Sequence, residues 1–176
     1  MTFSTRLRLA LSIAAHQHDG QYRKNGNYIP FIIHPVEVAF LVSAHTQNED
    51  ILVSALLHDV IEDTTGYSLS QMEADFGATV SDYVSLLTES SESHSLSWDD
   101  RHGLQSKRLE TAPDEVILTA LADKYANLSS GPTLDPSQLW YYRSISALAH
   151  SRPLTSSLPL LTDLDALIKS QPVSQL

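Results

Sequence analysis

The residues best suited to chemistry lie between Leu56 and Thr64, where a histidine and three acids follow a run that reads as buried. Residues four apart share one face of a helix, so His58 is expected above Glu62 and Asp59 above Asp63. Near a helix end His58 and Asp59 can converge on one ion, and both are suitable ligands for Mn, Fe or Zn. Glu62 and Asp63 could then position or deprotonate a metal-bound water. The alternative is a helix end with a solvated acidic patch.

Two further residues outside this stretch are candidate metal ligands. His34 precedes a helix start, where a histidine is more often a cap or a packing residue, and Asp123 follows an apolar helical run. Asp123 alone would be a surface acid or an ion pair with Lys124, and Asn127 lies one turn later on the same face. A site built from His34, His58, Asp59 and Asp123 would draw on three helices, as metal sites in helical bundles commonly do.

Hydrophobic residues at helical spacing predict the elements that must position these side chains. Proline, glycine and capping residues place the expected helix limits near 4–17, 35–44, 49–64, 70–76, 80–87, 98–111, 113–127 and 153–170, and another helix is expected to begin at Pro136 and to hold residues 140–143. Ser70 and Glu73 have capping-box spacing, and Glu89 to Ser97 is expected to be mobile without forming a domain boundary. The sequence therefore predicts an all-α bundle in one domain over 1–176, with a core at about 4–150 and a C-terminal helix at about 153–170.

Composition limits the classes of partner. The chain has 176 residues, no cysteine and a formal net charge of −10, so a metal would need histidine and carboxylate ligands. The negative charge argues against binding nucleic acid, and the N-terminal apolar run is too short to span a bilayer. Arg23 and Lys24 form a basic pair in a polar loop, which is either solvated or grips an anion. We expect a cytoplasmic protein, and a homo-oligomer is left open.

The order His34, His58-Asp59, Asp123 is similar to the ligand order of the HD phosphohydrolase superfamily. The surrounding sequence resembles the hydrolase domain of the bifunctional Rel/Spo stringent-response proteins, from the first helix to about Ala149. The segments that carry this resemblance are Ala14-Ala15-His16, Gly20-Gln21-Tyr22-Arg23-Lys24-Asn25-Gly26, Tyr28-Ile29-Pro30-Phe31-Ile32-Ile33-His34-Pro35, Val38-Ala39, Leu56-Leu57-His58-Asp59-Val60-Ile61-Glu62-Asp63-Thr64, Phe76-Gly77 and Leu121-Ala122-Asp123-Lys124 with Asn127. The chain thus looks like a stand-alone small alarmone hydrolase.

The resemblance implies an all-helical fold that binds one Mn²⁺ and hydrolyses the 3′-pyrophosphate of guanosine tetra- and pentaphosphate to GDP or GTP plus pyrophosphate. It also implies a role for each matching residue, with Tyr142 added by us as a candidate pocket residue. The implied metal ligands are His34, His58, Asp59 and Asp123, the catalytic acids are Glu62 and Asp63, and the nucleotide-binding residues are Arg23, Lys24 and Asn127.

Two positions depart from the family pattern on the expected phosphate side. Ala120 and Ser129 stand where relatives commonly carry basic residues, and the segment from Thr88 to Glu92 is acidic. These departures concern the identity of the substrate, and two alternatives to the alarmone hydrolase stay open. One is an HD phosphohydrolase for another nucleotide, such as an adenosine alarmone or a 3′-phosphorylated nucleotide. The other is a non-catalytic nucleotide-binding partner of an alarmone synthetase.

Overall fold

The computed structural model describes residues 4–24, 28–89, 95–131, 133–155 and 158–172, and in these ranges the chain forms helices joined by loops. Within these ranges the strand-type pairing is an isolated antiparallel bridge between Tyr22 and Pro30. The chain divides into two compact units, Met1–Thr88 and Glu89–Leu176. The helical secondary structure of the described residues confirms the predicted all-α class. The prediction of a single domain stays a prediction.

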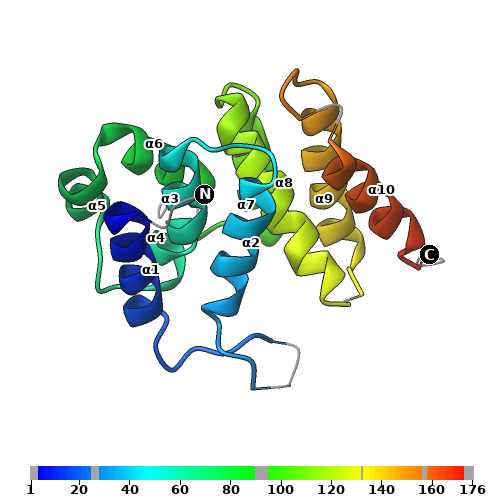
Figure 1. Ribbon diagram of the computed structural model, residues 1–176. Coiled ribbons are helices and arrows are strands. Elements are labelled where there is room, and N and C mark those ends of the chain that lie inside the picture. Colours follow the sequence, from blue (N-terminus) through cyan, green and yellow to red (C-terminus); the bar gives the residue numbers. More distant parts are fainter. Residues whose placement is uncertain (1–3, 25–27, 90–94, 132, 156–157, 173–176) are drawn as a thin grey trace. The chain divides into compact units, whose positions relative to one another are not determined.

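The first unit is built around one buried helix (Figure 1). Helix α3 packs against α1, α2 and α6, and all its residues from Ile51 to Leu57 are buried. Asn48 caps its start by accepting a hydrogen bond from the Asp50 amide. A helix that is apolar on all sides is held by its neighbours, so its C-terminal end has a fixed place. The helices of this unit are α1 (Thr5–Gln17), α2 (Ile33–Ser43), α3 (Glu49–Leu57), α4 (Val60–Asp63), α5 (Leu69–Phe76) and α6 (Ala78–Leu87).

Arg6 ties the start of α1 to two other helices of this unit. Its guanidinium lies 2.5 Å from an Asp50 carboxylate oxygen in the first turn of α3. It also donates to the Phe76 carbonyl at the end of α5, at 2.5 Å. Ser4 caps α1, as the sequence predicts, by accepting from the Leu7 amide. One cationic side chain therefore joins three helix ends on the first unit.

The second unit is organised around α8, which packs against α9 and α10. Every residue of α8 from Val116 to Asp123 is buried. Helix α9 begins at a capping box in which Asp135 and Gln138 exchange side-chain-to-backbone hydrogen bonds. The helices of this unit are α7 (Trp98–Leu109), α8 (Asp114–Ser129), α9 (Pro136–His150) and α10 (Pro159–Ser170).

Three local predictions differ from the structure. The acidic motif does not lie on one continuous helix, because α3 ends at Leu57 and α4 begins at Val60. The capping box before α5 is formed by Ser68 and Gln71 rather than Ser70 and Glu73. Both pairs have the required spacing, and the Ser68 choice adds a backbone hydrogen bond from the Met72 amide. The C-terminal helix begins at residue 159 rather than 153, with proline in its first turn. Most of the segment expected to be mobile, residues 90–94, lies outside the described residues.

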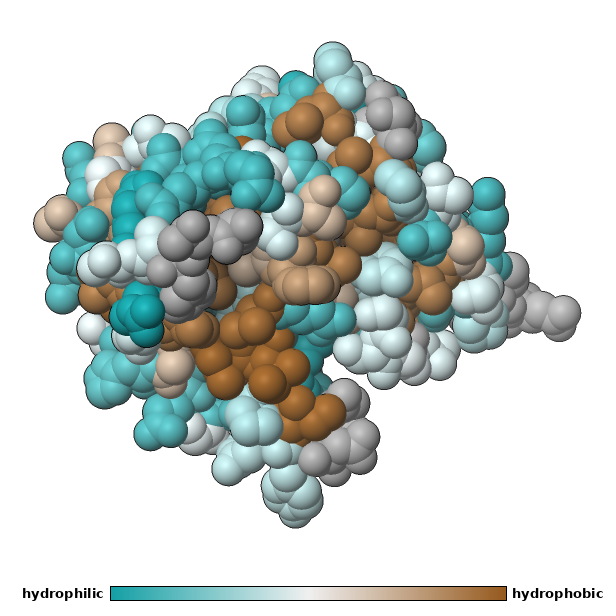
Figure 2. Space-filling view, in the orientation of Figure 1, coloured by the Kyte–Doolittle hydropathy of each residue, from teal (hydrophilic) through white to brown (hydrophobic). Residues whose placement is uncertain are grey.

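Helix α2 has an apolar face that is open to solvent. Ile33, Val36 and Phe40 lie three or four residues apart, and Phe40 is 76% exposed. Figure 2 shows apolar side chains gathered over α2 and the segment before it. In the described parts of the chain, the helices are too short or too polar to cross a membrane.

Candidate metal centre and active site

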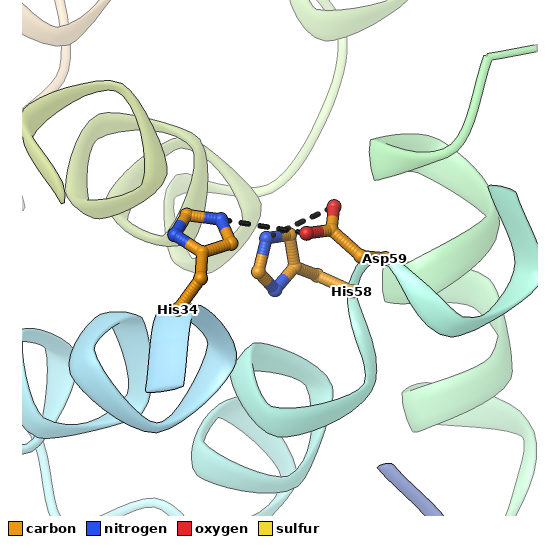
Figure 3. A group of neighbouring side chains, drawn as sticks. All are labelled: His34, His58 and Asp59. Carbon is orange, nitrogen blue, oxygen red and sulfur yellow. Dashed lines mark ion pairs between the residues drawn. The ribbon is translucent and has the colours of Figure 1, made fainter. Parts of the chain in front are cut away.

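Two histidines and an aspartate of the first unit converge on one point (Figure 3). His34 is in the first turn of α2, while His58 and Asp59 occupy the short junction between α3 and α4. Both junction residues keep right-handed helical dihedrals. The chain therefore changes direction between α3 and α4 with little backbone strain, because the dihedral angles of both residues are accessible to ordinary residues. The imidazoles are almost fully buried, whereas the Asp59 side chain is 22% exposed.

The distances between these side chains fit a shared cation. His34 Nε2 lies 3.4 Å from Asp59 Oδ2, and His58 Nε2 lies 3.1 Å from Asp59 Oδ1. One ligand atom from each of the three residues can be chosen so that all lie within 4.8 Å of one another. Ligand atoms about 2.1 Å from one ion, in tetrahedral or octahedral geometry, are about 3.0 to 3.4 Å apart. The observed spacings therefore suit a small divalent metal ion.

The protonation of His58 supports the same interpretation. Its Nδ1 lies 2.8 Å from the Ala55 carbonyl oxygen. A carbonyl can only accept, so Nδ1 carries the proton and Nε2 of the neutral ring presents a lone pair to Asp59. Two acceptors 3.1 Å apart require a cation or a further proton between them. A backbone carbonyl that fixes the tautomer in this way is the usual support for a metal-binding histidine.

The histidines also govern the charge of Asp59. Burial raises the pKa of its carboxyl group, but when the imidazoles are protonated, the positive charge of His58 and hydrogen bonds from His34 and His58 outweigh burial. The net result is a pKa far below the usual range for aspartate. The Asp59 carboxyl group therefore gives up its proton before the neighbouring imidazolium groups give up theirs, which leaves a carboxylate that can bind a metal.

Glu62 and Asp63 follow the metal cluster on α4, and both side chains are exposed. The Asp63 amide donates to the Asp59 carbonyl at 2.9 Å, so the acids begin one turn after the cluster. The pKa of Asp63 is raised, first by partial removal of its carboxyl group from water and then by the negative charge of Asp59. His18, Lys24 and His58 act in the opposite direction. A carboxyl group with a raised pKa is suited to moving a proton.

The basic pair lies in the loop between α1 and α2. Arg23 donates its amide to the Ile29 carbonyl at 2.9 Å, and its guanidinium lies 5.8 Å from the centre of the Phe31 ring. That ring is 5.7 Å from the ring of His34, so Phe31 connects Arg23 to the metal cluster. The positive charge of Lys24 acts on Asp63. The loop thus places Lys24 near Asp63 and Arg23 beside Phe31, and the contact of these two cations with nucleotide stays a prediction.

The remaining candidates belong to the second unit. On α8, Asp123 accepts a hydrogen bond from Lys124 at 2.5 Å and another from Asn127 at 2.6 Å. Burial lowers the pKa of Lys124, but Asp123 and the neighbouring tyrosines raise it well above its usual value. The Lys124 ammonium lies 5.8 Å from the centre of the half-buried Tyr142 ring. The ion pair with Lys124 is one of the alternatives that the sequence left open for Asp123, and Asn127 lies one turn later on the same helix, as the helical repeat predicts. The roles of Asp123, Asn127 and Tyr142 as ligand and nucleotide contacts stay predictions.

His18 and Gln21 both interact with Asp63 in the acidic turn of residues 62–64, which the sequence does not indicate. His18 is buried, and the Gln21 side chain donates to the Asp63 carbonyl. The one local signal is the three-residue spacing of His18 and Gln21 just after the first helix, which is also compatible with a simple helix end.

Comparison with known proteins gives the family. The sequence pattern of the HD domain matches residues 10–142. This chain belongs to the HD domain family. The matched residues include Asp123 and the metal cluster of His34, His58 and Asp59, so all four proposed ligands lie within the HD domain.

Relatives of this HD domain include proteins of alarmone metabolism. It is 33% identical over 130 residues to the guanosine-3′,5′-bis(diphosphate) 3′-pyrophosphohydrolase of Haemophilus influenzae. It is 34% identical over 137 residues to the bifunctional (p)ppGpp synthase/hydrolase SpoT of Escherichia coli. These matches cover 70% and 74% of this chain but 18% and 19% of those proteins. The chain therefore spans about a fifth of the length of these relatives.

A solved structure matches nearly the whole chain. It is that of a metazoan ortholog of SpoT described as hydrolysing ppGpp, with a TM-score of 0.80 and 28% sequence identity. The match covers 96% of this chain and 97% of the other. The chain is thus an HD-domain protein that resembles the (p)ppGpp hydrolase domain of the SpoT/Rel proteins.

Proposed function

We propose that this HD domain is a divalent-metal-dependent 3′-pyrophosphohydrolase of guanosine tetra- and pentaphosphate that produces GDP or GTP and pyrophosphate. The observation that carries the proposal is the convergence of His34, His58 and Asp59 within metal-binding distance. The relatedness to ppGpp hydrolases supports the substrate class. We propose Mn²⁺ as the metal and Asp123 as a fourth ligand.

Each part of the chain has a defined task in this reaction. The metal would supply Lewis-acid polarisation of a phosphoryl oxygen and a lowered pKa for water. Glu62 and Asp63 orient the attacking water, and the raised pKa of Asp63 lets its carboxyl oxygen take up a proton. Arg23 and Lys24 oppose the negative charge of the substrate, which is needed in a chain with a net charge of −10. Arginine can also bind a phosphate through two parallel hydrogen bonds.

The assay combines purified protein, guanosine tetraphosphate and Mn²⁺, and it identifies the products by chromatography. We expect equal amounts of GDP and pyrophosphate, and activity that is removed by a chelator and restored by added Mn²⁺. The double variant Glu62→Gln with Asp63→Asn should lose at least about 100-fold in kcat. Glu73→Gln with Asp82→Asn is the matched control, since both acids are exposed in the same unit. Absence of pyrophosphate from the wild-type reaction would overturn the proposal.

A second candidate function is hydrolysis of a different nucleotide. It is favoured by Ala120, which is 4% exposed, and by Ser129, whose hydroxyl group donates to the Ala126 carbonyl. Neither residue supplies a cation where relatives commonly have one. A panel of adenosine and guanosine nucleotides with 3′-phosphate or 3′-pyrophosphate groups separates the candidates by kcat/KM. Tight binding of nucleotide without turnover would instead indicate a non-catalytic binding protein.

A further inference from the structure

A chain of polar contacts joins the end of α1 to the acidic turn of residues 62–64. His18 follows α1 and is 3% exposed. Its Nδ1 lies 2.8 Å from Gln21 Oε1, and Gln21 Nε2 donates to the Asp63 carbonyl oxygen at 3.1 Å. The Gln21 side chain therefore lies between a buried imidazole and the backbone of the proposed catalytic acid.

The chemistry of the Gln21 amide group determines which atoms donate and which accept in this series of contacts. The Asp63 carbonyl can only accept, so the nitrogen of the Gln21 amide faces it and the oxygen faces His18. His18 Nδ1 must then carry a proton. The opposite amide orientation would place two oxygens against each other at Asp63. Gln21 is thus held in a single orientation by groups on both sides.

A second contact from α1 reaches the same turn. The Thr64 hydroxyl lies 3.2 Å from Gln17 Oε1 and 2.7 Å from the Val60 carbonyl. The backbone of Gly66 passes close to the Gln17 side chain. A Cβ atom at Gly66 would lie 2.5 Å from Gln17 Oε1, which is closer than Cβ atoms come to other atoms in real proteins. The end of α1 therefore contacts the acidic turn at two points.

The acidic turn needs such support because its own structure is weak. Helix α4 has four residues and no side-chain hydrogen bond at its cap, and a helix of this length is unstable by itself. Both of its acids are exposed. We propose that Gln21, oriented by His18, is a positioning residue that holds Asp63 at the distance from the metal cluster that hydrolysis requires. This inference rests on the proposed function.

The main test is the effect of Gln21→Ala on the separate kinetic constants. If Gln21 acts through Asp63, kcat falls about tenfold or more while KM changes by less than about twofold. A rise in KM with an unchanged kcat would mean that Gln21 acts through the neighbouring Arg23 and Lys24, and it would overturn the inference. Gln47→Ala is the matched control, because the Gln47 amide also donates to a backbone carbonyl, that of Ser43.

Substitutions at His18 test the direction of the hydrogen bonds. The side-chain amide of asparagine can place a donor where Nδ1 lies, so His18→Asn should retain most of kcat. His18→Leu removes the donor and should behave like Gln21→Ala. His16→Leu, at an exposed position on the same helix, is the control. Equal kcat values for the Asn and Leu variants at position 18 would contradict the proposed orientation.

Two further measurements separate this inference from the proposed function. In the Asp63→Asn background, Gln21→Ala should cause no further loss of kcat. In the metal-free protein, hydrogen exchange of the Asp63 and Thr64 amides should be about tenfold faster in Gln21→Ala and unchanged in Gln47→Ala. Unchanged exchange in Gln21→Ala overturns the positioning role whatever the activity. Faster exchange in a protein without pyrophosphohydrolase activity supports the contact and rejects the function.

Discussion

Asp59 and Asp123 are both mostly buried, with side chains 22% and 13% exposed, but the groups that contact their carboxylates differ. Asp59 lies against the ring nitrogens of His34 and His58. Asp123 accepts hydrogen bonds from Lys124 and from Asn127. In the first unit the carboxylate joins two groups that can bind a cation with it. In the second unit it already has a cation of its own.

This difference shows that burial of an acid beside basic groups does not by itself define a metal site. An imidazole can give a lone pair to a metal, whereas an ammonium group only donates hydrogen bonds. A metal that recruits Asp123 must therefore compete with Lys124 for the same carboxylate oxygen. The partners of the Asp59 carboxylate among the described residues are the two imidazoles, which do not compete with a metal when they are neutral. We expect Asp59 to contribute more to metal affinity than Asp123.

The largest effect is expected for Asp59→Asn. The variant keeps the size of the side chain but loses the charge between the imidazoles, so Mn²⁺ affinity should fall by more than about 100-fold, or about 2.7 kcal/mol. Isothermal titration calorimetry on the folded protein measures this, with Asp82→Asn as the control for an exposed acid of the same unit. Retained affinity would show that the cluster of His34, His58 and Asp59 does not hold the ion.

The next effect concerns stability of the second unit. Lys124→Met removes the cation beside the mostly buried Asp123 carboxylate and keeps the neutral hydrogen bond from Asn127, which should lower the free energy of unfolding by about 2 kcal/mol. The pair is partly exposed, so we expect less than the loss seen for fully buried pairs. Denaturant unfolding measures the change, and Lys107→Met at an exposed position is the control. Adding Asp123→Asn should recover part of the loss, and a failure to recover any would contradict the pairing.

Much of this contrast is accessible from sequence because the relevant signals are local. The caps at Ser4 and Asp135 follow from residue type and spacing, and the approach of Asn127 to Asp123 follows from the helical repeat. The His58-Asp59 pair is marked by the apolar run before it and by its likeness to the HD superfamily.

The parts that sequence did not predict depend on contacts between distant residues or on equivalent local choices. The break between α3 and α4 falls at residues with ordinary helical dihedrals, so neither glycine nor proline marks it. Ser68 and Ser70 both satisfy the spacing of a capping box, and their local patterns do not separate them. The bond from Gln21 to the Asp63 carbonyl spans 42 residues, and no periodicity relates those positions.

A smaller effect on metal binding is expected for Asp123→Asn. If Asp123 is the fourth ligand, Mn²⁺ affinity should fall by about tenfold, or about 1.4 kcal/mol. The loss is smaller than for Asp59→Asn because removing the charge also removes the competition with Lys124. The same calorimetry applies, with Asp99→Asn as the control for an exposed acid of the second unit. An unchanged affinity would exclude Asp123 from the ligand set and limit the site to the first unit.

The smallest effect is expected at the pair of His150 and Asp165, which tests whether a histidine beside an aspartate is enough to bind the metal. Asp165 on α10 accepts hydrogen bonds from Ser146 and lies 2.8 Å from His150 Nε2, both on α9. Burial raises the pKa of Asp165, but the Ser146 hydrogen bond and His150 outweigh it and lower the pKa below its ordinary value. The folded state therefore binds the proton less readily than the unfolded chain, so the contribution to stability is present above about pH 4 and disappears as pH falls through the folded pKa.

Asp165→Asn should cost about 1 kcal/mol at pH 7 and little at pH 2, by denaturant unfolding, while Asp163→Asn at an exposed position changes neither. Because His150 is 54% exposed and the pair joins two helices of one unit, Mn²⁺ affinity should be unchanged. A loss of Mn²⁺ affinity in Asp165→Asn would mean that the convergence of His34, His58 and Asp59 is not what distinguishes the metal centre.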